Sequence, residues 1–261
     1  MAEHRARRRF GQNFLQDPAI IAEIIALIAP QPGQHVVEIG PGLGALTTPL
    51  LHSNCDLDVV ELDRDLAAGL AQRIGADQRL QIHQQDALRF DFCSLARADK
   101  RLRIVGNLPY NISSPLLFAL FAQAHCIDDM YFMLQHEVVE RLTASPGSKA
   151  YGRLSVMAAL YCRCDYLLHV PPQAFQPVPK VDSAIVRLLP HRTPPVATDP
   201  QRIARVVAAA FSQRRKTLRN SLRQLLTAES IEACGIDPSL RAEVLSLADF
   251  SSLAEALADV G

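Results

Sequence analysis

Residues 38–47 read EIGPGLGALT and directly follow the strand-like run of residues 35–37. An apolar strand that ends at a glycine-rich turn and leads into a helix is typical of doubly wound α/β proteins, in which such turns approach a ligand. Glycines allow both the tight turn and the close approach of the backbone. Gly40, Gly42 and Ala45 satisfy the pattern G-x-G-x-x-G/A, so this turn alone does not exclude a dinucleotide-binding protein.

Strand-like and helix-like segments alternate from Gln34 to about Leu189. Predicted strands cover residues 35–39, 57–61, 80–83, 102–105 and 130–134, and helical patterns cover residues 43–51, 64–74, 115–124, 137–144 and 153–162. This alternation predicts a mostly parallel sheet with helices on both faces. Residues 166–170 and 184–189 should then pair as an antiparallel hairpin across a proline-rich loop.

A second domain is predicted near the end of the chain. Residues 190–200 read PHRTPPVATDP, and four prolines in these eleven residues predict a linker. Helical apolar spacing follows at Ile203, Val206, Val207, Ala210 and Phe211, and then at Leu218, Leu222, Leu225 and Leu226. With 261 residues, of which 49% are hydrophobic and 21% charged, the chain is neither disordered nor fibrous. We expect an α/β domain over residues 1–190 and a small all-helical domain over residues 191–261.

Basic residues are concentrated in two segments, although the formal net charge is zero. The N-terminal segment carries Arg5, Arg7, Arg8 and Arg9, and residues 201–223 carry seven basic residues and no acid. Within the second segment, Arg215, Arg219 and Arg223 follow the spacing i, i+4, i+8 and would form one strip on a continuous helix. Such a strip suits RNA phosphates, and the alternative is an ordinary solvated helix face.

The remaining composition predicts a soluble cytoplasmic protein without a metal site. The longest apolar stretches are too short to span a membrane, and the basic N-terminus leads into polar residues rather than a signal-peptide segment. The six cysteines lack metal-site spacing, so we expect reduced core thiols at Cys55, Cys93, Cys126, Cys162, Cys164 and Cys234.

Three carboxylates stand at or beside strand ends. Glu61 lies 21 residues after Gly40, where doubly wound proteins place a carboxylate that accepts hydrogen bonds from ribose hydroxyls. Glu38 would repel a pyrophosphate but tolerate the cationic amino-acid end of S-adenosylmethionine, and Asp86 can accept from an adenine amine. Together they favour S-adenosylmethionine over NAD, although Glu38 or Asp86 could instead cap a helix or turn.

The sequence GNLPYN at residues 106–111 follows the fourth predicted strand. The exocyclic amine of adenine is a poor nucleophile because its lone pair is delocalised into the ring. The side-chain oxygen of Asn107 and the carbonyl of Leu108, stiffened by Pro109, could accept its two N–H groups and aim the lone pair at an electrophile. Alone, the segment would be read as an ordinary turn with a core tyrosine, and its position after a strand and beside the carboxylates favours the catalytic interpretation.

Tyr110 would supply an aromatic face for a base removed from its stack. Extrusion of a base costs a few kcal/mol and stacking returns about 1–3 kcal/mol per base, so a second ring is expected. The candidate is Phe175, in a loop stiffened by prolines, with Lys180 placed to meet a phosphate. Core packing of Phe175 is the alternative.

Taken in order, these motifs resemble the ribosomal RNA adenine N6,N6-dimethyltransferases. The resemblance spans roughly residues 7–226 and rests on residues 12–15, 38–47, 61–63, 85–87, 106–110, 175–183 and 211–217. The large-subunit methyltransferases of the macrolide-resistance type share the Asn-Leu-Pro-Tyr loop. Residues 149–155 and 213–222 favour the small-subunit group, and residues 227–261 carry no motif of the family.

The resemblance implies a Rossmann-like seven-stranded methyltransferase sheet that binds S-adenosyl-L-methionine. It implies methyl transfer to N6 of two adjacent adenosines in the 3′-terminal hairpin of small-subunit (16S) ribosomal RNA, within a pre-ribosomal particle. The sequence shows no coiled-coil period or long apolar edge that suggests a stable dimer, so we expect a monomer. The cofactor-binding residues would be Asn13, Leu15, Gly40, Gly42, Glu61, Asp86 and Asn107. The catalytic residues would be Asn107, Leu108, Pro109 and Tyr110, and the RNA would contact Tyr110, Phe175, Lys180, Arg214, Arg215, Lys216, Arg219 and Arg223.

Two other function classes remain open at this point. A ribosome-assembly factor that binds RNA and uses catalysis little would also need the basic residues of the C-terminal segment. An NAD-dependent oxidoreductase would need a hydride-transfer acid or base near the glycine turn, and no motif places a His or Lys there.

Overall fold

The structure is a computed structural model that describes residues 13–97, 100–213 and 215–257. The chain divides into two compact units. Unit 1 contains the residues up to Val139 together with Asp165–Pro190, and unit 2 contains Glu140–Cys164 and the residues from His191 onward. The segment Glu140–Cys164, which the predicted boundary at residue 190 assigns to the first domain, thus clusters with the helical C-terminal part.

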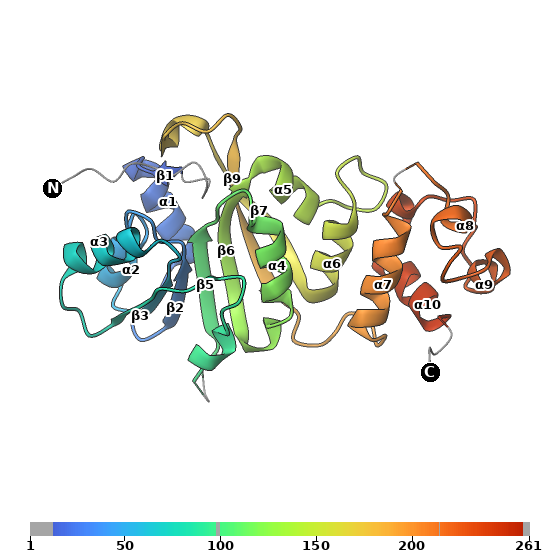
Figure 1. Ribbon diagram of the computed structural model, residues 1–261, viewed down its shortest axis with the longest axis horizontal. Helices are drawn as coiled ribbons and strands as arrows, with labels where there is room; N and C mark the ends of the chain where they lie inside the picture. Colours follow the sequence, from blue (N-terminus) through green and yellow to red (C-terminus); the bar gives the residue numbers. More distant parts are fainter. Residues whose placement is uncertain (1–12, 98–99, 214, 258–261) are drawn as a thin grey trace. The chain divides into compact units, whose positions relative to one another are not determined.

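Seven strands form one sheet in the order β4-β3-β2-β5-β6-β9-β7 (Figure 1). Their bounds are β2 His35–Ile39, β3 Asp56–Val60, β4 Leu80–His83, β5 Leu102–Asn107, β6 Ile127–Gln135, β7 Cys162–Val170 and β9 Ser183–Pro190. Neighbouring strands are parallel from β4 to β6, and β9 runs antiparallel to β6. The strand order reverses between β2 and β5, so the loops after these strands flank the crevice in which doubly wound sheets bind ligands.

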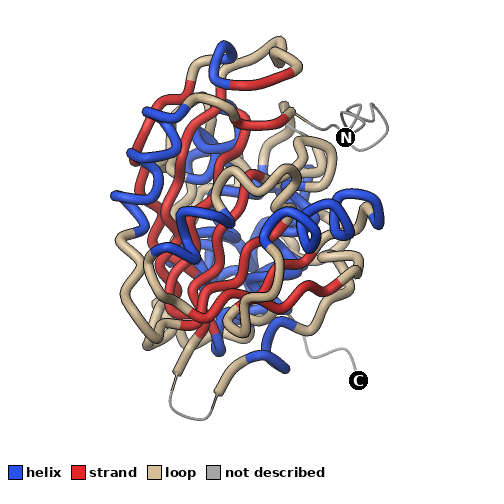
Figure 2. Tube along the Cα trace, turned by 90° about the vertical axis from the view of Figure 1, so that its left-hand side faces the viewer, coloured by secondary structure: helices blue, strands red, loops and turns tan. Residues whose placement is uncertain are grey.

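The helices are α1 Pro18–Ile28, α2 Thr47–His52, α3 Arg64–Ile74, α4 Ser113–Phe121, α5 His136–Leu142, α6 Arg153–Tyr161, α7 Pro200–Ala210, α8 Leu218–Ser221, α9 Ala228–Ala233 and α10 Leu247–Glu255. Figure 2 shows helices and strands along the chain. Helix α1 begins at Pro18 because the Asp17 carboxylate accepts from the Ala19 and Ile20 amides and proline suits the first helical position. None of the described helices is both long and apolar enough to cross a membrane.

The core of unit 1 joins one face of the sheet to the first three helices. Val36, Leu57, Val59 and Val105 from the strands share one apolar cluster with Ile24 and Ile28 of α1, Leu50 and Leu51 of α2, and Leu70 of α3. All of these side chains are at most 4% exposed. The β-branched runs seen in the sequence are therefore buried strands, as predicted.

A small second sheet ties the N-terminal segment to the proline-rich loop. Strands β1 (Phe14–Leu15) and β8 (Phe175–Gln176) pair antiparallel, and the Gln16 amide donates to the Ala174 carbonyl at 2.8 Å. The sequence analysis did not predict this pairing, because each strand is too short to show a period.

Unit 2 is helical and has its own core. Helix α7 buries Ile203, Val206, Val207 and Ala210, and α10 buries Phe250, Leu253 and Ala254. The Tyr151 hydroxyl donates to the Leu245 carbonyl at 2.7 Å, and burial raises the pKa of Tyr151 to about 12. Tyr151 therefore stays protonated at neutral pH and keeps this hydrogen bond.

Two of the six cysteines form a disulfide. Cys93 lies in the 3₁₀ helix η2 (Phe92–Leu95), Cys126 lies in η3 (Ala124–Cys126), and their Sγ atoms are bonded. The prediction of reduced thiols is wrong for this pair, whereas Cys55, Cys162, Cys164 and Cys234 form no disulfide. A separation of 33 residues gives no sequence signal, because the pairing depends on the fold that brings η2 beside η3.

A largely buried ion pair joins β5 and β6. The Arg103 guanidinium donates to both carboxylate oxygens of Asp129 at 2.8 and 2.9 Å. It also donates to Gln34 Oε1 at 2.9 Å and to the Ile28 carbonyl at 2.8 Å. Loss of the guanidinium would leave a charged carboxylate with little solvent, since the Asp129 side chain is 13% exposed.

We expect Arg103→Leu to lower the free energy of unfolding by about 3–5 kcal/mol, because it leaves the Asp129 carboxylate unpaired. Arg97→Leu is the matched control: Arg97 pairs with Asp56 at 2.8 Å, but its side chain is 53% exposed. The control should cost less than about 1 kcal/mol. Urea unfolding of both variants measures the difference, and equal losses would contradict this account of the buried pair.

Candidate active site

One pocket of unit 1 lies at the point where the strand order reverses. Its wall contains every cofactor-binding and catalytic residue predicted from the sequence: Asn13, Leu15, Gly40, Gly42, Glu61, Asp86, Asn107, Leu108, Pro109 and Tyr110. These residues follow β2, β3 and β4, lie at or just after the end of β5, or belong to the segment around β1. The fold thus brings together side chains that are far apart in the sequence.

The glycine turn adopts a backbone that side chains rarely allow. Gly40 and Gly42 have φ values of 66° and 56°, in the left-handed region that favours glycine. A Cβ atom on Gly42 would lie 3.2 Å from the ring of Phe14, which also lines the pocket. The Gly40 amide donates to the Val60 carbonyl at 2.9 Å, so the end of β3 fixes the turn.

Glu61 is held in place by backbone amides. Its Oε1 accepts from the Asp63 amide at 2.9 Å, and its Oε2 accepts from the Gly42 amide at 3.3 Å. Burial raises the pKa of Glu61, and these two hydrogen bonds oppose the rise. The carboxylate therefore links the glycine turn to the end of β3, where a ribose is expected.

Glu38 accepts a hydrogen bond from a side chain, whereas Asp86 accepts one from the backbone. The Thr47 hydroxyl donates to Glu38 Oε2 at 2.6 Å, so this carboxylate accepts from a side chain within the first turn of α2. Asp86 Oδ1 accepts from the Leu88 amide at 3.0 Å, which is the capping contact left open by the sequence. Both residues also line the pocket.

The Asn107 loop projects from the end of β5. Asn107 Nδ2 donates to the Asn13 carbonyl at 3.1 Å, and the Leu108 amide donates to the Met133 carbonyl at 3.1 Å. The first bond commits the nitrogen end of the amide to the protein and leaves Oδ1 as the end that can accept from a ligand. A Cβ on Gly106 would lie 2.5 Å from the Ile39 carbonyl, so only glycine allows β5 to approach β2 this closely.

Tyr110 is anchored through its hydroxyl group. The Tyr110 and Ser183 hydroxyls lie 2.8 Å apart, and Ser183 is fully buried at the start of β9. The sequence analysis missed Ser183, although it ends the last motif of the proline-rich loop. It also missed Leu62, which lines the pocket although 53% of it is exposed.

Phe175 and Lys180 lie outside the set of pocket-lining residues. Phe175 is 2% exposed and belongs to the apolar core of unit 1, so core packing, the alternative left open, describes its position. In this structure its ring offers no open face to a base. Lys180 is exposed in the loop between β8 and β9.

The predicted RNA-binding residues Arg215, Lys216, Arg219 and Arg223 are exposed, but the continuous helix predicted beneath them is wrong. Helix α8 contains only Leu218–Ser221, so Arg215 and Arg223 lie in turns on either side of Arg219. The reason is that the Leu218 and Arg219 amides donate to the carbonyls of Leu240 and Pro238 instead of continuing a helix from the preceding turn.

Arg219 also has acidic neighbours that the sequence analysis did not foresee. Hydrogen bonds from Ser239 and then the charge of Arg219 hold the pKa of Asp237 below its usual value. Lys216 is exposed like the arginines. Arg214 and the N-terminal Arg5, Arg7, Arg8 and Arg9 lie outside the described residues.

Carboxylates at three neighbouring strand ends suit a ligand that carries cationic groups and hydroxyls better than a pyrophosphate. The pocket also offers glycines at the backbone, where a ligand can approach closely. Fold and pocket together define the class: unit 1 is an S-adenosylmethionine-dependent methyltransferase domain.

Comparison with known proteins narrows this class. The family model described as ribosomal RNA adenine dimethylase matches residues 3–259. The ribosomal RNA small subunit methyltransferase A of Alcanivorax borkumensis is 56% identical over 255 residues, covering 97% of this chain and 91% of that protein. The protein of the same name from Pseudomonas aeruginosa is 56% identical over 259 residues, covering 99% and 97%. The chain belongs to the ribosomal RNA adenine dimethylase family.

Solved structures agree with this assignment. A dimethyladenosine transferase from Plasmodium falciparum superposes with a TM-score of 0.78 at 25% identity, covering 92% of this chain and 95% of that chain. The 23S rRNA methyltransferase ErmE gives a TM-score of 0.72 at 26% identity, covering 94% and 99%. The fold is thus shared with a methyltransferase of large-subunit RNA, and the NAD-dependent oxidoreductase alternative is excluded.

Glu38 makes the pocket sensitive to pH. Burial raises the pKa of Glu38 to about 7, against the hydrogen bond from Thr47, and the charge of Glu61 adds to the rise. The folded protein therefore holds this proton more tightly than the unfolded chain does. The free energy of unfolding must fall as pH rises from the ordinary carboxyl pKa through about 7.

We expect Glu38→Gln to remove this part of the pH dependence, since glutamine keeps an acceptor for Thr47 and carries no charge. Relative to wild type, the variant should gain up to about 3 kcal/mol between about pH 5 and pH 8. Urea unfolding without cofactor at a series of pH values measures the gain. A stability difference that does not change with pH would show that Glu38 titrates normally.

Proposed function

We propose that this enzyme transfers methyl groups from S-adenosylmethionine to N6 of two adjacent adenosines in the 3′-terminal hairpin of small-subunit ribosomal RNA. The names of relatives that are 56% identical over almost the whole chain support the small subunit as the source of the substrate. The enzyme would act in the cytoplasm, as a monomer, on a pre-ribosomal small subunit. Two methyl transfers to each adenine would give N6,N6-dimethyladenosine.

The observation that carries the proposal is the orientation of Asn107. Its Nδ2 atom is engaged by the Asn13 carbonyl, so Oδ1 is the acceptor that remains for an adenine amine. In the proposed mechanism, this oxygen and the Leu108 carbonyl accept the two N–H groups, and Pro109 keeps the loop extended. Tyr110, anchored by Ser183, would support the extruded base by stacking.

The reaction needs orientation more than a strong base. S-adenosylmethionine supplies a methyl group already activated by the positive charge on sulfur. Correct placement of two reactants corresponds to effective molarities of about 10⁵–10⁸ M, which is enough for a large share of the rate. Asp86, Glu61 and Gly40 would hold the adenine, ribose and amino-acid parts of the cofactor.

We expect Asn107→Ala to lower the rate of methyl transfer about 10- to 100-fold, because the amine loses one acceptor and its orientation. Cofactor affinity, measured by equilibrium binding of S-adenosylmethionine, should change much less. Asn111→Ala is the matched control, since Asn111 also lines the pocket but is exposed. Near-normal turnover of Asn107→Ala, or an equal loss in both variants, would refute the proposed role of Asn107.

We also propose that unit 2 contributes to RNA binding through its exposed basic side chains. Arg215, Lys216 and Arg223 lie in exposed turns, where each could meet a phosphate. A ribosome-assembly factor would need the same exposed basic side chains to bind RNA. Both roles are compatible in one enzyme.

Replacing Arg215, Arg219 and Arg223 with Gln should flatten the salt dependence of RNA binding by up to about one unit of log–log slope per residue. Arg219 should contribute least, because Asp237 already neutralises part of its field. Arg241→Gln is the control, since Arg241 is exposed but lies 4.0 Å from Glu243. Fluorescence anisotropy with the hairpin RNA at several salt concentrations measures the slopes, and unchanged slopes would remove these arginines from the interface.

A further inference from the structure

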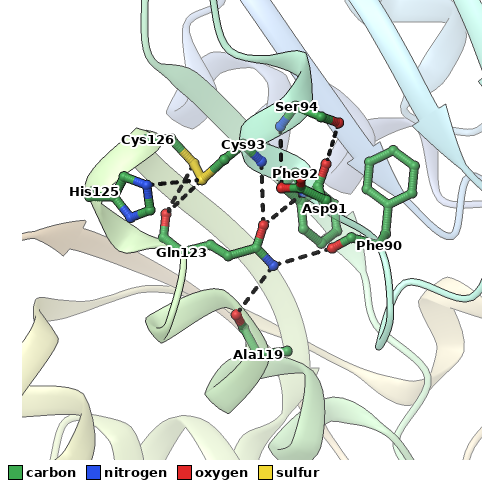
Figure 3. Close-up of a disulfide and its surroundings, with 9 residues drawn as sticks. All are labelled: Phe90, Asp91, Phe92, Cys93, Ser94, Ala119, Gln123, His125 and Cys126. Atoms are coloured by element: carbon green, nitrogen blue, oxygen red, sulfur yellow. Dashed lines mark hydrogen bonds between the residues drawn. A yellow bond between two sulfur atoms is a disulfide. The ribbon is translucent and has the colours of Figure 1, made fainter.

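Cys93, His125 and Cys126 form a compact cluster of metal-ligating side chains outside the methyltransferase pocket (Figure 3). One ligand atom from each residue lies within 4.8 Å of the other two. Cys126 is buried, Cys93 is partly buried and His125 is exposed, so the cluster opens to solvent on one side. Nothing in the methyl-transfer reaction uses these three side chains.

The backbone around the cluster is held by Gln123, independently of the disulfide. Gln123 Oε1 accepts from the Phe92 amide at 2.7 Å and from the Cys93 amide at 3.3 Å, and its Nε2 donates to the Phe90 carbonyl at 3.2 Å. Figure 3 shows this side chain lying between the two segments. When the disulfide is reduced, these hydrogen bonds keep the two cysteines close together.

The spacing of the three donors suits a tetrahedral Zn²⁺ ion. With Zn–S bonds of about 2.3 Å and Zn–N bonds of about 2.0–2.1 Å, a sulfur and a nitrogen ligand lie about 3.6 Å apart, and two sulfur ligands lie about 3.8 Å apart. His125 Nε2 already lies 3.5 Å from Cys93 Sγ. The two sulfur atoms must separate, and rotation of the two cysteine side chains allows this because their Cα atoms are 5.5 Å apart.

We propose that the reduced protein binds one Zn²⁺ ion through Cys93, Cys126 and His125, and that the disulfide form does not. A dithiol reductant would supply two electrons and two protons to the disulfide, giving two thiols and the oxidised dithiol. Zn²⁺ then displaces both thiol protons, binds the two thiolates and the neutral imidazole, and takes water as its fourth ligand.

The site makes zinc binding depend on the oxidation state of the chain. In the disulfide, neither sulfur carries the negative charge that a zinc ligand needs. In the dithiol form, two thiolates and one imidazole can bind the same Zn²⁺ ion. Zinc and the disulfide are therefore mutually exclusive, and this inference does not depend on the proposed RNA substrate.

The test uses the full chain, reduced with a phosphine and then freed of reductant without oxygen. Zinc is titrated against a chromophoric chelator, with the oxidised protein as reference. We expect one tightly bound Zn²⁺ per chain in the reduced protein and none in the oxidised protein. Cys93→Ser should abolish tight binding, and His125→Ala should weaken it about 10- to 100-fold. Cys164→Ser, at a partly exposed cysteine outside the disulfide, should bind zinc like wild type.

Co²⁺ provides a second measurement on the unmodified reduced chain, in case a cysteine variant fails to fold. Thiolate-to-cobalt absorption together with intense tetrahedral bands would support the site. Several results would overturn the proposal: no zinc in the reduced protein, equal zinc in both oxidation states, wild-type affinity in Cys93→Ser or His125→Ala, or cobalt spectra without thiolate bands.

Discussion

The close approach of β5 to β2 at Gly106 is the constraint on which the catalytic crevice depends. A Cβ at this position would lie 2.5 Å from the Ile39 carbonyl, a distance that real side chains do not reach. Beyond Val105, its last residue paired with β2, the strand can therefore pass beside Ile39 only because residue 106 is glycine. This contact places the Asn107 loop against the glycine turn that follows β2, and the Asn13 carbonyl then fixes the amide of Asn107. The buried Arg103–Asp129 pair holds the other side of β5.

Charge in the crevice is arranged by burial and by hydrogen bonding. The Gly42 and Asp63 amides donate to Glu61 and oppose the rise of its pKa, whereas Glu38 accepts from the Thr47 hydroxyl and burial raises its pKa to about 7. A ligand that brings positive charge next to Glu38 favours its ionised form. Cofactor binding and the charge of this carboxylate are thus coupled, which is consistent with a methyltransferase that binds a sulfonium compound.

The sequence predicts those structural features that depend on local residue patterns. The strand at His35–Ile39 and the helix at Arg64–Ile74 agree with their predicted bounds, because β-branched runs and apolar periods express burial directly. Every cofactor-binding and catalytic residue predicted lines the pocket, since strand ends in a parallel sheet meet at one edge. Contacts between residues far apart in the sequence could not be predicted, because no local pattern indicates them. The pairing of β1 with β8 buries Phe175, the bonds to Pro238 and Leu240 shorten α8, and the disulfide joins two short 3₁₀ helices.

The most direct test of the account is a map of the methyl groups that the enzyme adds. Small ribosomal subunits from cells that lack this protein are incubated with the enzyme and S-adenosylmethionine labelled in its methyl group, and the RNA is digested and analysed by mass spectrometry. The account predicts N6,N6-dimethyladenosine at two adjacent positions of the 3′-terminal hairpin. Label confined to other nucleotides, or transfer to large-subunit RNA instead, would contradict it.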